Sequence, residues 1–156
     1  MKYVLILIIV LTVFGSTGEL WAQNVTVVNN LLYGNILPGI PKTIDKTSAG
    51  SAAEYYISGI AGNEISVEFS LPTYMSVSGN NMQLVFSETG CSIDTTAVPD
   101  QSSPTFDDLD PWHPLIYRLG SNGMTIWLGG MVIPGLIQYA GDYSAVIVIT
   151  VTYTGN

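Results

Sequence analysis

Hydrophobic and polar residues alternate with a period of two along much of this chain, which is the pattern of β-strands with one buried face. The clearest example is residues 64–70, where Ile65, Val67 and Phe69 share one face. The same alternation predicts further strands over residues 53–58, 81–87, 115–119 and 124–128. No segment sustains the spacing of an amphipathic helix. The pattern therefore predicts an all-β protein.

The longest alternating run covers residues 142–154. Tyr143, Ile147 and Val151 fall on one of its faces, and the other face is apolar in the middle and polar toward its ends. A central strand with one core face and one partly covered face has this pattern, so we expect one here. Turns rich in glycine, asparagine and proline separate the runs. Many short strands with regular turns indicate an antiparallel sandwich or barrel.

The first 22 residues differ from the rest of the chain. Lys2 is followed by an apolar run from Tyr3 to Phe14, then by glycine and serine, and Ala22 offers a small residue for cleavage. A basic start, a short apolar core and a small cleavage residue describe a secretory signal peptide. The run is shorter than the roughly 20 residues that span a membrane. We therefore expect residues 1–22 to be a signal peptide, residues 23–156 to form one domain, and no membrane insertion after cleavage.

Composition excludes several function classes. Only 4 residues are Lys or Arg against 12 Asp or Glu, and the formal net charge is −8. Nucleic-acid binding depends on Lys and Arg that neutralise phosphates, so no nucleic-acid partner is expected. A single Cys and a single His exclude an internal disulfide, a multi-thiolate zinc site and a two-His metal site. We expect no cofactor and no resident metal.

Three segments in order resemble a known family. Residues 31–39 (LLYGNILPG), residues 52–72 (AAEYYISGIAGNEISVEFSLP), and the pair 128–130 (LGG) and 140–145 (AGDYSA) carry the resemblance. Together they resemble a family of secreted bacterial β-sandwich domains of unknown function. That family is similar to the spore coat protein U domain and to pilins of the archaic chaperone–usher kind. The resemblance implies an immunoglobulin-like antiparallel β-sandwich, secreted to the bacterial surface or the extracellular space.

Two residues in these motifs have structural roles that can be predicted. Gly34 can adopt backbone dihedrals forbidden to other residues, so we expect a bend or bulge after Tyr33. Tyr143 follows a turn, and we expect its ring in the core and its hydroxyl bonded to nearby backbone, as in a tyrosine corner.

An acidic, proline-rich stretch breaks the alternation. Residues 98–114 hold four prolines and four aspartates, and we expect a long surface loop covering about residues 91–114. Asp107, Asp108 and Asp110, with Asp94 and Asp100 nearby, could ligate calcium, but their spacing does not match an EF-hand. A solvated acidic loop is the preferred interpretation.

Catalytic candidates are few. His113 would need a nucleophile or substrate within hydrogen-bond reach to act as a base, and a loop histidine packed beside Trp112 is the simpler interpretation. Cys91 is expected to be a small, partly buried residue, with an intermolecular disulfide as the alternative. Glu64 and Glu68 lie on one strand face and are expected to face solvent. No nucleophile, base and orienting group can be assembled, so we do not expect an enzyme.

Aromatic residues open a second kind of function. A sugar-stacking platform is conceivable, although aromatic residues in strands are more often core or cross-strand pairs. The residues concerned are Trp112, Trp127, Tyr55, Tyr56, Tyr117 and Tyr139.

The segment from Gln23 to Tyr33 is the most informative for function. Val25, Val27, Leu31 and Tyr33 share one parity, interrupted at Asn29. This strand can pair within its own domain, or it can insert into a groove of the next subunit and build a head-to-tail fibre.

We therefore expect a structural or adhesive surface protein. The leading hypothesis is a pilin-like subunit that assembles by exchange of its N-terminal strand. The alternative is a monomeric binding module for glycans or for another surface protein.

Overall fold

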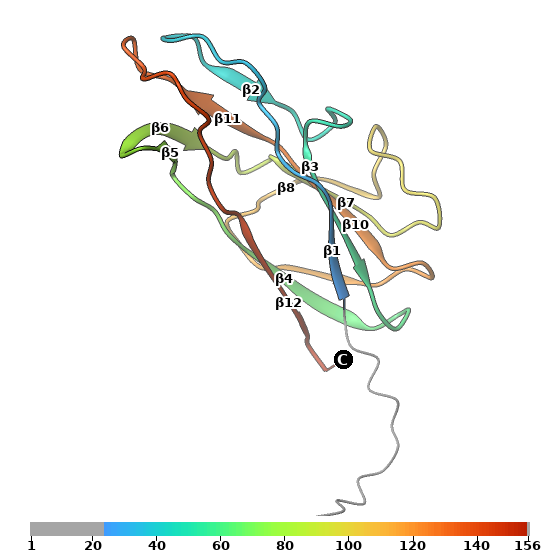
Figure 1. Ribbon diagram of the computed structural model, residues 1–156. Coiled ribbons are helices and arrows are strands. Elements are labelled where there is room, and N and C mark those ends of the chain that lie inside the picture. Colours follow the sequence, from blue (N-terminus) through green and yellow to red (C-terminus); the bar gives the residue numbers. More distant parts are fainter. Residues whose placement is uncertain (1–23, 156) are drawn as a thin grey trace, which may run out of the picture.

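The computed structural model describes residues 24–155, which form an all-β protein with antiparallel strand pairing (Figure 1). The expected signal peptide, residues 1–22, lies outside the described residues. Within the described part, no helix is long and apolar enough to cross a bilayer. The strands are β1 (Asn24–Asn29), β2 (Lys42–Ile44), β3 (Ala53–Ser58), β4 (Glu64–Ser70), β5 (Tyr74–Val77), β6 (Asn80–Val85), β7 (Cys91–Asp94), β8 (Phe106–Leu109), β9 (Leu115–Arg118), β10 (Met124–Leu128), β11 (Gly130–Ile133) and β12 (Val148–Tyr153).

The strands form three sheets that enclose one core. A five-stranded sheet has the order β1-β3-β10-β7-β8. A four-stranded sheet, β2-β11-β6-β5, and a three-stranded sheet, β12-β4-β9, supply the rest of the sandwich. The two smaller sheets are linked to each other. β4 leads into β5, and an isolated bridge joins Ser76 of β5 to Ser144, which precedes β12 in the chain.

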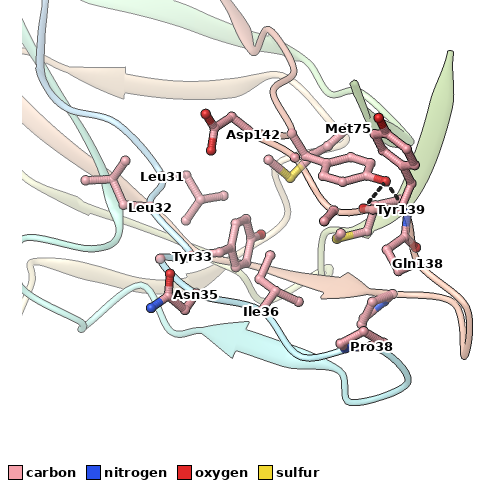
Figure 2. A pocket seen from close by; sticks show the side chains of 16 residues that line it. Leu31, Leu32, Tyr33, Asn35, Ile36, Pro38, Met75, Gln138, Tyr139 and Asp142 are labelled. Carbon is pink, nitrogen blue, oxygen red and sulfur yellow. Dashed lines mark hydrogen bonds between the residues drawn. The ribbon is translucent and has the colours of Figure 1, made fainter. Parts of the chain in front are cut away.

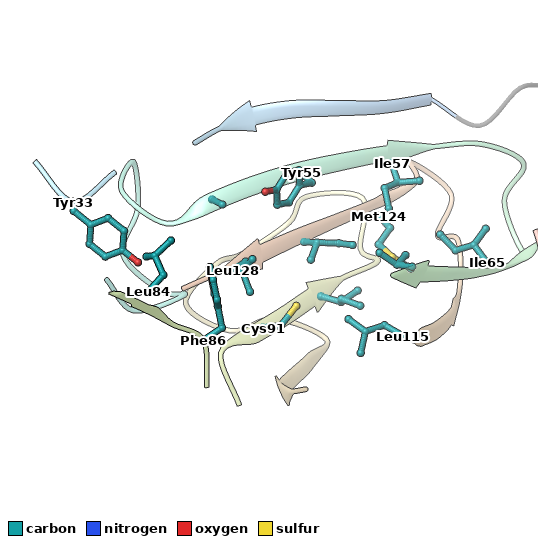
Figure 3. Packing of buried hydrophobic residues seen from close by; sticks show 14 of the residues in the cluster. Tyr33, Tyr55, Ile57, Ile65, Leu84, Phe86, Cys91, Leu115, Met124 and Leu128 are labelled. Atoms are coloured by element: carbon teal, nitrogen blue, oxygen red, sulfur yellow. The ribbon is translucent and has the colours of Figure 1, made fainter. Parts of the chain in front are cut away.

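Buried side chains from all three sheets meet in a single cluster (Figure 3). Ile57 and Ile126 come from the five-stranded sheet, and Val67 comes from the three-stranded sheet. Leu84 and Val132 come from the four-stranded sheet. Their packing removes apolar surface from water, which is the main stabilising contribution in a domain with no disulfide.

Several strand predictions are confirmed. β3 and β4 have the predicted bounds, and Ile57, Ile65 and Val67 point into the core as their parity requires. β6, β9 and β10 fall within one or two residues of prediction. Gly34 has a φ of 60°, as the expected bend after Tyr33 requires.

The expected central strand over residues 142–154 is wrong in length and in place. β12 covers only Val148–Tyr153, and it is an edge strand of its sheet. Its partner β4 ends at Ser70, which is opposite Val148. The residues before Val148 therefore have no part of β4 opposite them. They keep the alternating sequence but form no continuous ladder with β4.

The expected long surface loop over residues 91–114 is also wrong in part. β7 begins at Cys91 and lies inside the five-stranded sheet between β10 and β8, with all four of its residues buried. β8 covers Phe106–Leu109 within the acidic stretch and forms the edge of the same sheet. Only the connection between these two strands, with the residues after β8, is loop.

Candidate functional site

Two sheet edges meet on one side of the sandwich. β1 ends the five-stranded sheet and pairs with β3, and β12 ends the three-stranded sheet and pairs with β4. In the part of the chain that the structure describes, no further strand continues either sheet on this side. We call it the open side, and it lies between β1 and β12 in Figure 1.

The opposite side of the sandwich is closed by aromatic packing. There β8 and β9 are the edge strands, and the rings of Phe106 and Tyr117 lie 4.4 Å apart, centroid to centroid. The open side instead exposes a row of half-buried apolar side chains. Val25 lies on β1, Ile147 lies just before β12, and Ile149 lies on β12. These residues pack against the core without covering one another fully.

A cleft of about 500 Å³ lies at one end of the open side (Figure 2). One wall is the segment that follows β1, residues 31–38, and the other is the segment that precedes β12, residues 138–143. In Figure 2, Leu31, Tyr33 and Ile36 face Met75 across the cleft.

Hydrogen bonds hold the second wall. Tyr143 donates from its hydroxyl to the carbonyl of Tyr139 at 2.9 Å, which confirms the expected bond to nearby backbone, while its ring is half-buried against the core and lines the cleft. Gln138 donates to the hydroxyl of Tyr143 at 2.5 Å and to the carbonyl of Asn81 at 3.2 Å. The wall is therefore a braced segment rather than a loose loop.

The lining combines apolar and aromatic side chains with a comparable share of polar surface. Among its residues only Asp142 carries a charge. Tyr33 is 5% exposed, its hydroxyl has no hydrogen-bond partner, and burial raises its pKa above the usual range. A cleft with mixed polar and apolar walls and a single charged residue can accept an uncharged extended strand, whose backbone is polar and whose side chains can be apolar.

The four residues predicted for strand exchange, Val25, Val27, Leu31 and Tyr33, do not all lie at one place in the structure. Leu31 and Tyr33 line the cleft, and Val25 packs against the core from β1. Val27 is 55% exposed. A register shift between Val27 and Asn29 explains the interrupted parity, because it turns the Asn29 side chain toward the carbonyl of Ala52, to which it donates at 2.7 Å.

β1 itself pairs with β3 of the same chain. Val25 lies opposite Ile57, and Val27 lies opposite Tyr55. Of the two alternatives for this segment, the structure shows pairing within the domain.

Lys46 was not singled out from the sequence, yet it organises the acidic stretch. Its side chain is 8% exposed, and its Nζ lies 2.7 Å from Asp107 and 2.6 Å from Asp108. Nζ also donates to the carbonyl of Thr89 at 2.8 Å. Burial alone would lower the pKa of Lys46, but the hydrogen bonds to the two carboxylates outweigh it and the pKa is raised. A lone lysine in a loop gives no sequence signal for this role.

Asp94 is buried, so the interpretation of a wholly solvated acidic loop is wrong at this position. Its two oxygens accept backbone N–H groups, Oδ1 from Thr96 at 2.7 Å and Oδ2 from Asp100 at 3.0 Å. The hydroxyl of Thr105 adds a third bond. Burial raises the pKa of Asp94, but these bonds favour the charged form and the pKa is lowered overall. No cluster of metal-ligating side chains forms among the described residues.

Asp94→Asn should lower the free energy of unfolding at pH 7 by about 2 kcal/mol, because the amide must turn its NH₂ toward one of the two backbone donors. Since the folded pKa of Asp94 lies below the unfolded value, its contribution is full above about pH 4 and is lost as the pH falls through the folded pKa. Urea unfolding at pH 7 and pH 3 tests this, with the exposed Asp142→Asn as control. An equal loss of stability at both pH values would contradict the assignment.

Most of the residues considered as catalytic candidates from the sequence make contacts that stabilise the fold or are shielded from solvent. His113 is exposed and pairs with Asp110, with Nδ1 and Oδ2 2.7 Å apart. Cys91 is fully buried, and burial raises its pKa to about 12, so it is a poor nucleophile. Glu64 is half-buried and accepts from the Thr154 hydroxyl at 2.7 Å, so only Glu68 faces solvent as expected.

The aromatic residues do not share one exposed face. Trp127 and Tyr55 are buried in the core, which removes them from any sugar platform. Trp112 packs on Phe86, with ring centroids 6.3 Å apart, and Tyr139 lines the cleft.

Comparison with known proteins adds no relative. No family model matches the chain, and no curated protein matches it.

Proposed function

We propose that this protein is a pilin-like structural subunit of the bacterial surface, and that it binds an extended strand of a neighbouring copy along its open side. The observation that carries the proposal is the open side itself, where two sheets end beside a row of half-buried apolar residues and a cleft. Strand addition provides main-chain hydrogen bonds together with pockets for alternate side chains.

Strand order supports an immunoglobulin-like sandwich in which no strand of the described residues takes the last position. In that fold one sheet has the order A-B-E-D and the other contains C, F and G. Here β1-β3-β10-β7 follows the first order, and β4 next to β12 corresponds to C next to F. The position of strand G, beside β12, would then be filled by another chain.

The donor strand in this proposal is β1 of the neighbouring copy. β1 is an edge strand with a register shift, and four of its six residues are exposed. Leaving β3 would break five registered backbone pairs and the core contact of Val25, and the same kinds of contact would have to form again in the acceptor. Leu31 and Tyr33 stay behind in the core and the cleft, which makes the chain near Asn30 the hinge. Val25 and Val27 would lie on the face that enters the acceptor. A head-to-tail contact of this kind does not close, so it produces filaments.

A reversible lock on β1 tests the proposal. Asn24 and Ser58 are directly paired across β1 and β3, so the double variant Asn24→Cys/Ser58→Cys can tie the two strands by a disulfide. The buried Cys91 will not compete for oxidation. We expect the naturally processed wild-type protein to form filaments in electron micrographs. The oxidised double variant should stay monomeric, and reduction should restore filaments.

The single variant Asn24→Cys controls for the substitution itself and should assemble like the wild type. Filaments from the oxidised, locked protein would rule out β1 as the donor. A wild-type protein that stays monomeric at every concentration would rule out the subunit function.

A further inference from the structure

Two loops lie side by side at the end of the sandwich farthest from the C-terminus (Figure 1). They cover residues 34–41, between β1 and β2, and residues 134–141, after β11. The N–H of Gly39 donates to the carbonyl of Gly135 at 3.0 Å. An added Cβ on Gly39 would lie 2.9 Å from Leu136 Cδ2, so the two loops are in direct contact.

Large aliphatic side chains project from both loops into solvent. The exposed fractions are 65% for Leu37, 57% for Ile40, 88% for Leu136 and 100% for Ile137. We call these four residues the loop tip. Exposed apolar groups that gather in this way commonly mark an interaction site.

The loops around the tip carry no charge. No Asp, Glu, Lys, Arg or His occurs in residues 34–41 or 134–141, and the nearest charged residues along the chain are Lys42 and Asp142. Burial of the loop tip in an apolar medium therefore requires no desolvation of a charge.

Some backbone groups near the tip are hydrogen-bonded within the protein. The N–H of Ile40 donates to the carbonyl of Leu37 at 3.2 Å, which closes the turn at Pro38 and Gly39. The N–H of Gly135 donates to Oε1 of Gln138 at 2.8 Å. An unsatisfied backbone group is costly in hydrocarbon, and these bonds remove part of that cost.

In contrast to the expectation from sequence that the processed protein does not insert into a membrane, we propose that the loop tip inserts into the apolar layer of a lipid bilayer. The tip projects from the end of the molecule, and a bilayer accommodates a projection of any shape, whereas a protein partner needs a matching cavity. Tyr139, 58% exposed, and Lys42 lie behind the tip on the same two segments, where amphipathic rings and cationic side chains meet lipid headgroups. The tip lies outside β1 and β12, so this proposal does not depend on strand exchange.

Charge decides which bilayer is preferred. With a formal net charge of −8, the protein is repelled by anionic headgroups. We expect binding to zwitterionic phosphatidylcholine vesicles. Added phosphatidylserine should weaken binding at low salt, and 0.5 M NaCl should relieve most of that effect because salt screens the repulsion.

Vesicle flotation with a matched pair of variants tests the proposal. The naturally processed protein is used, after mass spectrometry has located its N-terminus. Ile137→Asp should lower the partition coefficient at least ~10-fold, because a fully exposed aliphatic side chain becomes a charge at the point of entry. Val98→Asp makes the same chemical change on a different loop, at a residue that is 84% exposed, and should leave binding unchanged. Both sites are on the surface, so the melting temperature should not change in either variant.

Wild-type protein that fails to float with phosphatidylcholine vesicles would overturn the proposal. Equal losses in Ile137→Asp and Val98→Asp would also overturn it, because binding would then be nonspecific. If Ile137→Asp disrupts self-association while the wild-type protein does not float, the loop tip is an interface between copies and the bilayer assignment is wrong.

Discussion

Gly129→Ala is expected to lower the free energy of unfolding by about 4 kcal/mol. Gly129 is the one residue between β10 in the five-stranded sheet and β11 in the four-stranded sheet. A Cβ there would lie 2.6 Å from the carbonyl oxygen of Ile44 and 2.7 Å from the nitrogen of Lys46. Both are backbone atoms, so relief requires β2 to move away from β11.

Thermal unfolding measures the effect, and a fall in melting temperature of about 15 °C corresponds to that loss. Gly135→Ala is the control. Its Cβ would meet only Oε1 of Gln138 at 3.6 Å, so stability should stay the same or rise slightly as the unfolded chain loses freedom. A Gly129→Ala protein as stable as the control would show that β2 is not held tightly against the connection between β10 and β11.

The double variant Asp107→Asn/Asp108→Asn is expected to lose about 3 kcal/mol, because it leaves the ammonium of Lys46 buried without a counter-ion. Lys46→Met should cost far less. It removes the buried charge and keeps most of the packing, and the released carboxylates, which are 52% and 73% exposed, can hydrate.

Urea unfolding of the two variants and of the triple variant completes a cycle. The triple variant should recover most of the loss, since no buried charge is left unpaired. Additive losses in the triple variant would mean that Lys46 and the two aspartates do not act as one unit.

The alternating pattern predicted strands best where one face is buried and a partner runs alongside. β3 and β4 met both conditions, and their bounds follow from sequence. β7 was missed because its alternating run is only four residues long, Cys91 to Asp94, and leads into the acidic, proline-rich stretch; that its polar members are buried as well is decided by the neighbouring strands. β8 was missed because its aspartates belong to an edge strand whose composition is that of a loop.

The candidate site was predicted from one wall only. The segment from Val25 to Tyr33 was singled out by its parity, and Leu31 and Tyr33 do line the cleft. The other wall, residues 138–143, is about a hundred residues later in the chain, and no local signal connects the two. Lys46 was missed for the same reason, because its counter-ions come from β8.

The sequence by itself determined the all-β class, the core-facing parity of the main strands and the bond from the Tyr143 hydroxyl to nearby backbone, because each depends on residues a few positions apart. Only the tertiary structure decided that β12 is an edge strand, that β1 and β12 leave one side of the sandwich open, and that two uncharged loops meet at one tip. These features depend on which strands become neighbours. Pairing is chosen by the whole chain through burial and register, so a local pattern can indicate a strand without naming its partner.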